Sequence, residues 1–527
     1  MAVGATRKKV LRKFKLRGYI LQTDALEEIL SFLTQFEDAE DEAINVLLDE
    51  INKESLNSSV LDRDSVHRVI SLLHEAESAV EASPSSSNRS HFRIVDSFII
   101  PKFCYDPIKK TFYERTGKLP IHGEASSKAA LYRDRFELLL QRLSRDPHFA
   151  KPAFDSEFNS SDSCEISPIQ SLIGQTGRRW IMGVISQLED GHFYLEDMTA
   201  AVPVNLSNAK ITTGFFVENT VIVAEGELLP SGTFQVNTCG FPPLEARDES
   251  FSLLVGLDFF GCGAVPTEEM LRLSELEKKA VNDMFVIFSD IWLDDAETME
   301  RLAIVLNGYE NEAVVPSLFV FMGNFCSRPC NLAFNAFSSL RSQFGKLGEM
   351  IGAHTRLMEQ SQFLFIPGPE DAGPSTVLPR PALSKYLTEE LQKHVPNAIF
   401  KSNPCRIKFY TQEIVFFRQD LLYKMRRSCL IPPSTEETSD PFEHLVATIT
   451  HQSHLCPLPL TVQPIIWNYD HCLRLYPAPH TIVLGDRSEQ KTFEYTGTTC
   501  FNTGSFSSDS TFAAYFPCTK KVELSAL

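Results

Sequence analysis

The amino-acid sequence predicts a multidomain protein, in which a small N-terminal all-α bundle precedes a small β-barrel and a layered α/β domain. With 527 residues, the chain is too long for one compact core. Its apolar residues recur first at helical spacing, then at the alternate spacing of strands, and finally in strands that alternate with helices. Ser-rich stretches without apolar periodicity separate these regions and indicate where the domains begin and end.

Residues 1–80 are predicted to form the helical domain. Apolar residues three and four positions apart place one buried stripe on each of several short helices. Asp24 and Glu27 have the spacing of a capping box, which favours a helix start there. Three or four such helices would form an independent bundle. The stripes are Val10, Leu11 and Phe14; Leu26, Ile29, Leu30 and Leu33; Ile44, Leu47, Leu48 and Ile51; and Val66, Val69, Ile70 and Leu73.

Residues 81–165 are predicted to connect the bundle to the rest of the chain. They begin with the Ser-rich sequence EASPSSSNRS at 81–90, a composition that is typical of a flexible linker. A helix is predicted over 131–146, because LYRDRFELLLQRLSRD has helical periodicity and is followed by Pro147. Residues 155–168 are again polar and Ser-rich, and they indicate a second linker.

Residues 166–275 are predicted to form a β-barrel of the OB-fold type. Between Trp180 and Phe241, apolar and polar residues alternate in several short strands, which are joined by turns such as 230–232. No long helix interrupts these strands, and this favours a small barrel. A β-sandwich is the alternative, but about five strands are few for that architecture.

Residues 282–500 are predicted to form the α/β domain, and 501–527 a C-terminal segment. Three continuous apolar runs in the domain have the pattern of strands buried on both faces. Each run ends in polar loop residues, and helices lie between the runs. Ligands of open α/β sheets bind at the carboxyl ends of the strands, so these loops form the candidate site. The runs are MFVIF at 284–288, SLFVFM at 317–322 and FLFIP at 363–367.

The composition excludes several classes of protein. The net charge of −18 disfavours a protein that grips DNA over a broad surface, because phosphates need clustered Lys and Arg. No apolar run reaches the roughly 18 residues that span a membrane. The 12 cysteines include no C-x-x-C pair, which favours reduced thiols over a zinc ribbon. The N-terminal segment lacks the apolar core of a secretory signal, so the protein is expected to stay inside the cell. The alternative is that this segment is a mitochondrial transit peptide.

The polar residues after the predicted strands resemble the motifs of calcineurin-like metallophosphoesterases. Members of that family carry D-x-H, G-D, G-N-H-D and G-H-x-H in this order and hold two metal ions with them. Most of the ligands are replaced here, so the resemblance implies an inactive site with no catalytic residue and no metal. The alternative is a residual phosphoesterase with one metal on Asp290 and His454. The degenerate positions are Asp290, Trp292, Asn324, Glu370, Asp371, His454 and Cys456.

A small barrel followed by a degenerate phosphoesterase resembles the B subunits of eukaryotic replicative DNA polymerases. The sequence is most similar to the epsilon branch of that family, and the similarity covers nearly the whole chain. The helical N-terminal domain favours the same branch over the alpha and delta branches, which are the alternatives. The blocks that carry the resemblance include FSDIWLD at 288–294, FIPGPEDAG at 365–373, LPRPAL at 378–383 and HLCPLPL at 454–460.

The resemblance implies a non-catalytic accessory protein that acts in chromosomal DNA replication and repair in the nucleus. In that family the barrel and the phosphoesterase-like domain bind the zinc-carrying C-terminal domain of the catalytic subunit. Zinc is therefore expected on the partner, and no cofactor on this chain. The N-terminal domain resembles the lid domain of AAA+ ATPases without a P-loop, and its implied partner is the replicative helicase complex. Contact with DNA is expected to be weak or indirect, and no membrane contact is expected.

Two further sets of residues are candidates for binding. Aromatic side chains dominate interface energetics, so four of them are candidate anchors for the polymerase partner, with ordinary core packing as the alternative. A basic run near the N-terminus is a candidate nuclear-targeting signal or phosphate contact, with a solvated helix face as the alternative. The aromatic set is Phe259, Phe260, Trp292 and Trp467; the basic set is Arg7, Lys8, Lys9, Arg12, Lys13, Lys15 and Arg17.

Overall fold

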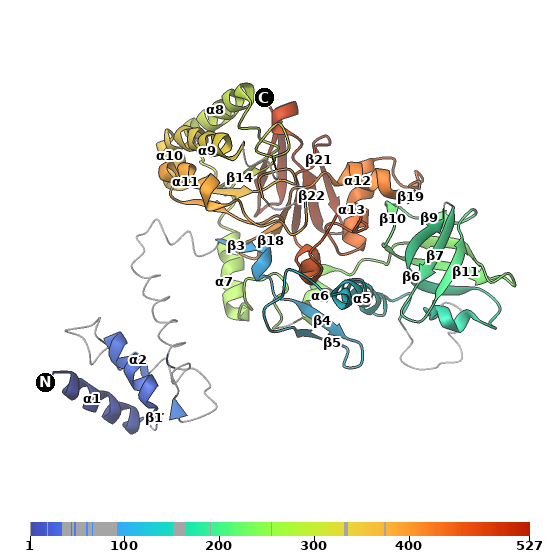
Figure 1. Cartoon of the computed structure of the whole chain (residues 1–527), viewed down its shortest axis with the longest axis horizontal. Helices are drawn as coiled ribbons and strands as arrows, with labels where there is room; N and C mark the ends of the chain where they lie inside the picture. The colour runs from blue at the N-terminus through green and yellow to red at the C-terminus, as the bar shows by residue number, and fades with distance from the viewer. Residues whose placement is uncertain are drawn as a thin grey trace. The chain divides into compact units, whose positions relative to one another are not determined.

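The computed structural model of the chain divides into two compact units, residues 1–90 and 91–527, each of which is described by itself (Figure 1). No helix among the described residues is long and apolar enough to cross a membrane. The structure describes residues 2–17, 19–33, 44, 47–48, 60–61, 66, 92–150, 164–189, 191–254, 256–330, 336–373 and 376–527.

The first unit contains the two predicted N-terminal helices, α1 (Ala2–Leu16) and α2 (Thr23–Leu33). Between them lies β1 (Ile20–Leu21), which pairs in parallel with β2 (Val60–Leu61). The described residues of this unit are therefore not purely helical, which the sequence analysis predicted them to be. The two strands were missed because a two-residue pairing leaves no periodic signal in the sequence. The predicted stripe residues 51, 69, 70 and 73 lie outside the described residues. The core of the unit contains Val10, Phe14, Leu26, Ile29, Ile44, Leu47, Leu48, Leu61 and Val66.

The barrel occupies the first part of the second unit. Its strands are ordered β11-β6-β7-β8-β12-β9, and the additional pairing of β11 with β12 closes the sheet on itself. Alternate residues point into the closed sheet, and they include Ile181, Ile185, Leu195 and Val236. The strands are β6 (Arg179–Glu189), β7 (His192–Glu196), β8 (Ala201–Asn205), β9 (Lys210–Ile211), β11 (Val221–Leu228) and β12 (Phe234–Gly240).

Two six-stranded sheets form the centre of the α/β domain. The first has the order β16-β15-β14-β13-β23-β24, and the second the order β21-β22-β20-β18-β17-β3. The first sheet consists of β13 (Phe285–Ser289), β14 (Leu318–Met322), β15 (Gln362–Ile366), β16 (Ala398–Phe400), β23 (Thr511–Phe516) and β24 (Lys521–Ala526). The second consists of β3 (Phe92–Asp96), β17 (Cys405–Phe409), β18 (Gln412–Phe417), β20 (Thr481–Leu484), β21 (Lys491–Tyr495) and β22 (Thr498–Asn502).

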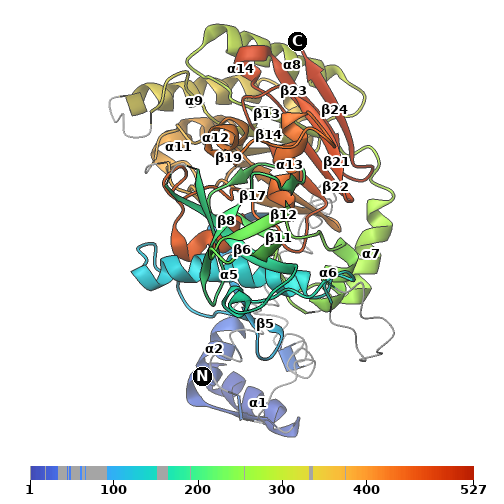
Figure 2. The same cartoon turned by 90° about the vertical axis from the view of Figure 1, so that its right-hand side faces the viewer.

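The two sheets pack face to face, and helices cover their outer faces (Figures 1 and 2). Phe285 of β13 lies in the core between the sheets with Ile407 of β17, and neighbouring Val286 lies in the outer core beneath the helices. This is why β13, β14 and β15 are apolar at nearly every position. On the first sheet lie α8 (Ala296–Asn311), α9 (Phe337–Gly352), α10 (Thr355–Gln360) and α11 (Lys385–His394); on the second lie α12 (Leu421–Ser428) and α13 (Pro441–His451).

Two segments that the sequence analysis set apart from the α/β domain belong to its sheets. Strand β3, from the predicted connecting segment 81–165, pairs with β17. The predicted C-terminal segment 501–527 supplies β23, which pairs with β13 in the middle of the first sheet. The strands that join them to the domain, β17 and β13, lie far away in the sequence, so neither segment carries a local sign of its membership.

The remaining elements lie in the segments that precede, join or follow the strands of the barrel and the sheets. Helix α5 (Ala125–Leu143) begins before the predicted range of 131–146, and its last turns pack against β6 and β11 of the barrel. The others are the hairpin β4 (Phe103–Asp106) and β5 (Thr111–Glu114), α6 (Arg247–Leu253), α7 (Thr267–Glu277), α14 (Phe506–Asp509), and the short 3-10 turns Ser97–Ile99, Ile169–Leu172 and Trp467–Leu473.

Backbone pairing and buried side chains join the barrel to the α/β domain. Strand β10 (Phe216–Val217) pairs with β19 (Cys429–Ile431). Gln452, which follows α13, both accepts from the amide of Val221 and donates to its carbonyl, at 2.9 and 2.8 Å. Arg142 of α5 is buried and donates to the Ser453 hydroxyl at 2.6 Å, and it also donates to two backbone carbonyls, of Pro242 and His451. The barrel and the α/β domain are therefore fixed to each other within one compact unit.

We expect Arg142→Ala to destabilise this unit by about 3 kcal/mol, because it removes the guanidinium donor to the Ser453 hydroxyl and to the carbonyls of Pro242 and His451. Urea unfolding of the whole chain measures the effect. The matched control is Arg133→Ala, which removes an exposed arginine from the same helix and should change the stability by less than about 0.5 kcal/mol. Equal stabilities of the two variants would contradict this role of Arg142.

Candidate functional site

The candidate site lies where the carboxyl ends of five strands meet, three from the first sheet and two from the second. Strands β13, β14 and β15 run parallel, and they are followed by Asp290, Asn324 and the 368–371 loop. Strands β18 and β20 of the second sheet also run parallel to each other, and they are followed by Arg418 and Arg487. The chain therefore brings the predicted acidic and amide residues together, and it adds two arginines that the sequence analysis missed.

Asp290 is at the centre of the site and is 1% exposed. Its carboxylate accepts hydrogen bonds from Nη2 of Arg418 at 3.2 Å, from Nε of Arg487 at 3.2 Å and from the hydroxyl of Ser505 at 2.8 Å. Burial alone would raise the pKa of Asp290, but the two guanidinium groups outweigh it and hold that pKa below its ordinary value. Asp290 is therefore a buried anion that two cations neutralise.

Arg418 is fully buried and connects the ends of four strands. Its guanidinium donates to the Gly323 carbonyl after β14, to the Gly485 carbonyl after β20 at 2.7 Å, and to Asp420 at 2.8 Å, as well as to Asp290. These partners hold the pKa of Arg418 above its ordinary value, although burial acts in the opposite direction. Its charge is therefore a permanent part of the site.

Arg487 closes the site on the solvent side. Besides Asp290, it contacts Glu370 at 3.1 Å. Asn324 fixes the same Glu370, because its side-chain amide donates to the carboxylate at 3.1 Å and its carbonyl oxygen accepts from the Glu370 backbone at 3.0 Å. These contacts link the loops after β14, β15 and β20.

Asp371 serves the backbone of the site. It is fully buried and accepts from the amides of Phe325 at 2.6 Å and Gly368 at 2.7 Å. Burial raises its pKa to about 6, although the amides and nearby arginines act in the opposite direction. Both carboxylate oxygens accept hydrogen bonds that fix two loops. Asp371 therefore has a structural role and is not a metal ligand.

The residues at this edge do not fit a two-metal centre. A pair of divalent cations needs several converging anionic or neutral ligands. Here Asp290 is the main anion, and its carboxylate oxygens already accept hydrogen bonds from the guanidinium groups of Arg418 and Arg487. Among the described residues, no three His, Cys, Asp or Glu side chains converge as a metal-binding group. Trp292 is half-buried beside the site, where its backbone amide donates to Ser507 and its indole nitrogen is buried without a partner.

His454 and Cys456 follow helix α13 rather than a strand of either sheet, which is not the strand-end position that the alignment of 453–456 with the last phosphoesterase motif predicts. His454 follows helix α13 and is buried against Asp470 at 3.2 Å. Cys456 is buried, and burial raises its pKa to about 11. The strand-end position is instead held by Gly485, Asp486 and Arg487 after β20. The sequence carried a signal for it, because the apolar run TIVL at 481–484 also ends in polar residues.

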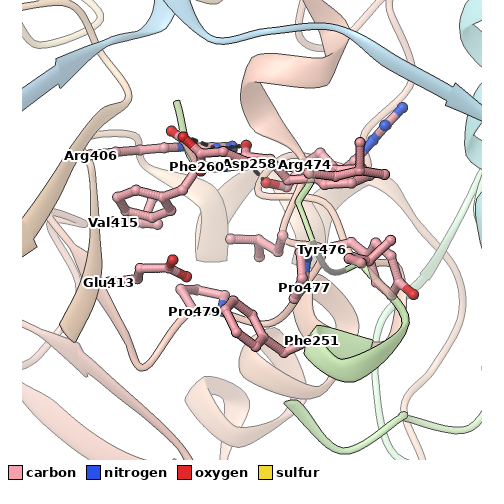
Figure 3. A pocket seen from close by; sticks show the side chains of 14 residues that line it. Phe251, Asp258, Phe260, Arg406, Glu413, Val415, Arg474, Tyr476, Pro477 and Pro479 are labelled. Atoms are coloured by element: carbon pink, nitrogen blue, oxygen red, sulfur yellow. Dashed lines mark hydrogen bonds between the residues drawn. The ribbon is translucent and has the colours of Figure 1, made fainter. Parts of the chain in front are cut away.

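Phe259 and Phe260 are core residues rather than exposed interface anchors. Phe259 stacks on Phe103 at a ring distance of 4.4 Å, and the Phe260 ring lies under the Arg406 guanidinium at 5.3 Å. Figure 3 shows this region, where Phe260 and Arg406 line a pocket of about 30 Å³. That volume holds roughly one or two water molecules, so the pocket is too small for an organic ligand. Trp467 is half-buried, and its ring edge lies beside Gly123.

The basic N-terminal set lies on and just after α1. The side chains of Arg7, Arg12, Lys15 and Arg17 are exposed, and those of Lys9 and Lys13 are half-buried; the side chain of Lys8 lies outside the described residues. The exposed members agree with a solvated helix face, and Arg7, Arg12 and Lys15 among them are also accessible to a partner. The structure thus leaves both alternatives open for this set.

Replacing Arg418 tests the charge balance of the site. We expect Arg418→Met to destabilise the fold by about 3–5 kcal/mol, because it leaves the buried Asp290 with only the partly exposed Arg487 as a cation and removes the donor to two buried carbonyls. Arg487 is 38% exposed, so Arg487→Met should cost only about 1 kcal/mol. The double variant Asp290→Asn/Arg418→Met should recover part of the loss, since it removes the charge. Denaturant unfolding measures all three, and no recovery in the double variant would contradict the explanation.

His454 makes stability depend on pH. Its Nδ1 accepts from the Cys456 amide at 3.1 Å, and burial lowers its pKa to about 4. The unfolded chain protonates this histidine near pH 6.5, so it binds more protons than the folded chain below that pH. At a pH of about 5.5, His454 should therefore lower the free energy of unfolding by about 1.4 kcal/mol relative to neutral pH. Urea unfolding at both pH values should show a smaller difference for His454→Gln, and an unchanged difference would refute the assignment.

Comparison with known proteins identifies the three parts of the chain separately. Residues 3–71 match the family model described as DNA polymerases epsilon N terminal, 125–243 the OB-fold domain of DNA polymerase epsilon subunit 2-like proteins, and 285–494 the B subunit of DNA polymerase alpha/epsilon. A solved archaeal phosphodiesterase covers 46% of this chain and 99% of its own at 8% identity, with a TM-score of 0.24, a similarity too low to bear on activity.

Relatives of known name match the chain over its length. The B subunit of DNA polymerase epsilon from Arabidopsis thaliana is 66% identical over 99% of both chains. DNA polymerase epsilon subunit 2 of Homo sapiens is 34% identical over 100% of this chain and 99% of its own, and the Schizosaccharomyces pombe B subunit is 29% identical over 80% and 74%. The chain belongs to the family of DNA polymerase epsilon B subunits.

Proposed function

We propose that this chain is a non-catalytic scaffold subunit of DNA polymerase epsilon. The observation that carries the proposal is the pair of arginines at Asp290: Arg418 and Arg487 neutralise the carboxylate at the place where a phosphoesterase would hold its metals. A guanidinium cannot be deprotonated near neutral pH and cannot bind a cation. The residues at the edge of the sheets therefore stabilise the fold rather than carry out catalysis. The proposed role of the α/β domain is to bind a partner.

The joining of the barrel to the α/β domain supports the scaffold. Residues 91–527 form one compact unit, and the contacts of Arg142, Gln452 and strand β10 fix its two parts to each other. A rigid surface composed of two domains loses little conformational freedom on binding, which favours a stable complex. Such a surface suits a permanent subunit interface better than a transient contact.

The proposed partner is the zinc-carrying C-terminal domain of the polymerase's catalytic subunit. This chain would contribute no zinc of its own. Of the four aromatic candidates, only the half-buried Trp292 and Trp467 retain surface for such an interface. Membership of the epsilon family disfavours the alternative of an alpha or delta B subunit, and the filled site disfavours the alternative of a residual phosphoesterase.

The proposal extends to the place of the complex in the cell. The first unit, residues 1–90, would connect the polymerase to the replicative helicase complex, and the basic face of α1 would serve that contact or nuclear import. Chromosomal replication and repair place the protein in the nucleus. Contact with DNA would be weak or indirect, because the net charge of −18 repels a polyanion.

Co-expression with the C-terminal zinc domain of the epsilon catalytic subunit tests the proposal. Size-exclusion chromatography should show a stoichiometric complex, and metal analysis should find only the zinc that the partner carries. The matched control is the C-terminal domain of the delta catalytic subunit, which should elute separately. If the two epsilon proteins elute separately and metal is found on this chain alone, the result would contradict the proposal and favour the phosphoesterase alternative.

A further inference from the structure

An open hollow lies beside helix α12, close to the arginine-filled site but on its solvent side. Its volume is about 900 Å³, and Tyr423, Arg426 and Arg427 of the helix form one wall. The loop after β20, with Arg487 and Ser488, also lines the hollow. We call this feature the α12 hollow. The interior pocket of Figure 3 has a volume of about 30 Å³, so the α12 hollow offers far more room for a partner.

The carboxylates that line the α12 hollow are already engaged by the chain. Asp420 accepts from Arg418 at 2.8 Å and from the Arg487 amide at 3.2 Å. Asp486 is 3% exposed, and it accepts from the amides of Leu422 and Ser488, each at 2.9 Å. Neither carboxylate is therefore available to neutralise the arginines of α12.

Arg426 and Arg427 are exposed at the end of α12. Within the described part of the chain, no carboxylate pairs with either guanidinium; Arg427 donates to the hydroxyl of Tyr423 at 3.1 Å. On this chain of charge −18, two exposed arginines without acidic partners form a local positive patch. An anionic group is the ligand that such a patch attracts, and a carboxylate can bind the planar fork of a guanidinium with both oxygens.

The same wall also offers an apolar contact. Tyr423 is 65% exposed, and it shares one helix face with the two arginines because they lie three and four positions further on. The bond from Arg427 holds the tyrosine hydroxyl, so the ring is oriented before any partner arrives. Tyrosine and arginine are the residue types most enriched among those that dominate protein–protein binding energy.

We infer that the α12 hollow docks an acidic segment of a protein partner, with a carboxylate on Arg426 or Arg427 and an aromatic or aliphatic side chain on the ring of Tyr423. Single-stranded nucleic acid fits less well. Its backbone needs a basic groove that follows several phosphates, whereas this patch is short and rests on Arg426 and Arg427. The inference does not depend on the polymerase partner, because it concerns a surface of this chain alone.

Fluorescence anisotropy with the whole chain tests the inference. The probe is a short labelled peptide of Asp and Glu residues around one Phe, and it should bind with saturation and more weakly as salt is added. Arg426→Glu/Arg427→Glu should weaken binding at least about tenfold, and Tyr423→Ala by several-fold. The matched control is Lys109→Glu/Lys110→Glu, which makes the same change of charge on the exposed turn between β4 and β5 and should leave the affinity unchanged.

Three results would overturn the inference. The first is no saturable binding of the peptide to the wild-type chain. The second is an equal loss of affinity in the Lys109/Lys110 control, which would indicate a general effect of net charge. The third is tighter binding of a labelled oligothymidine that depends on Arg426 and Arg427, which would identify the α12 hollow as a nucleic-acid site. Circular dichroism of each variant checks that it is folded.

Discussion

The buried ion pair between Arg418 and Asp290 is the interaction on which the candidate site depends. A carboxylate that is 1% exposed would be expensive in isolation, and the guanidinium that neutralises it is itself fully buried. Arg418 also donates to the carbonyls of Gly323 and Gly485, so one side chain ties the first sheet to the second. The neutralisation of Asp290 and the alignment of the strand ends are thus achieved by the same contacts.

This arrangement explains how the strand ends of the layered α/β domain are held together by side chains of the chain itself. Metal ions would neutralise the acidic loops and hold them together from a central point. In this chain Arg418 and Arg487 supply the positive charge, and Asn324, Glu370 and Asp371 connect the loops through hydrogen bonds. The stability of the edge then needs no cation. The outer surface, including the α12 hollow, is free to serve protein contacts.

Much of the fold could be predicted from the sequence, because its signals are local. Apolar runs such as 284–288 and 317–322 and the alternation between Trp180 and Phe241 follow directly from burial on two faces or one. The contribution of β3 and of β23 could not be predicted in this way, since each pairs with strands far away in the chain.

For the site, the motif order located Asp290, Asn324, Glu370 and Asp371, which the structure brings together. The motif order did not locate Arg418 and Arg487. Their loops follow strands but contain no histidine, whereas the histidine-containing sequence SHLC at 453–456 follows a helix. For Phe259 and Phe260 the structure favours the alternative of core packing, which one sequence does not separate from a surface position.

At the carboxyl edge of the sheets, two guanidinium groups hold the Asp290 carboxylate in the position where a metal ion would need it. A crystal of the chain soaked in Mn²⁺ and measured for anomalous scattering tests it most directly. The account predicts no anomalous peak near Asp290, with Arg418 and Arg487 still bonded to its carboxylate. A strong peak between Asp290 and the loops after β14 and β15, with the arginines displaced, would contradict it.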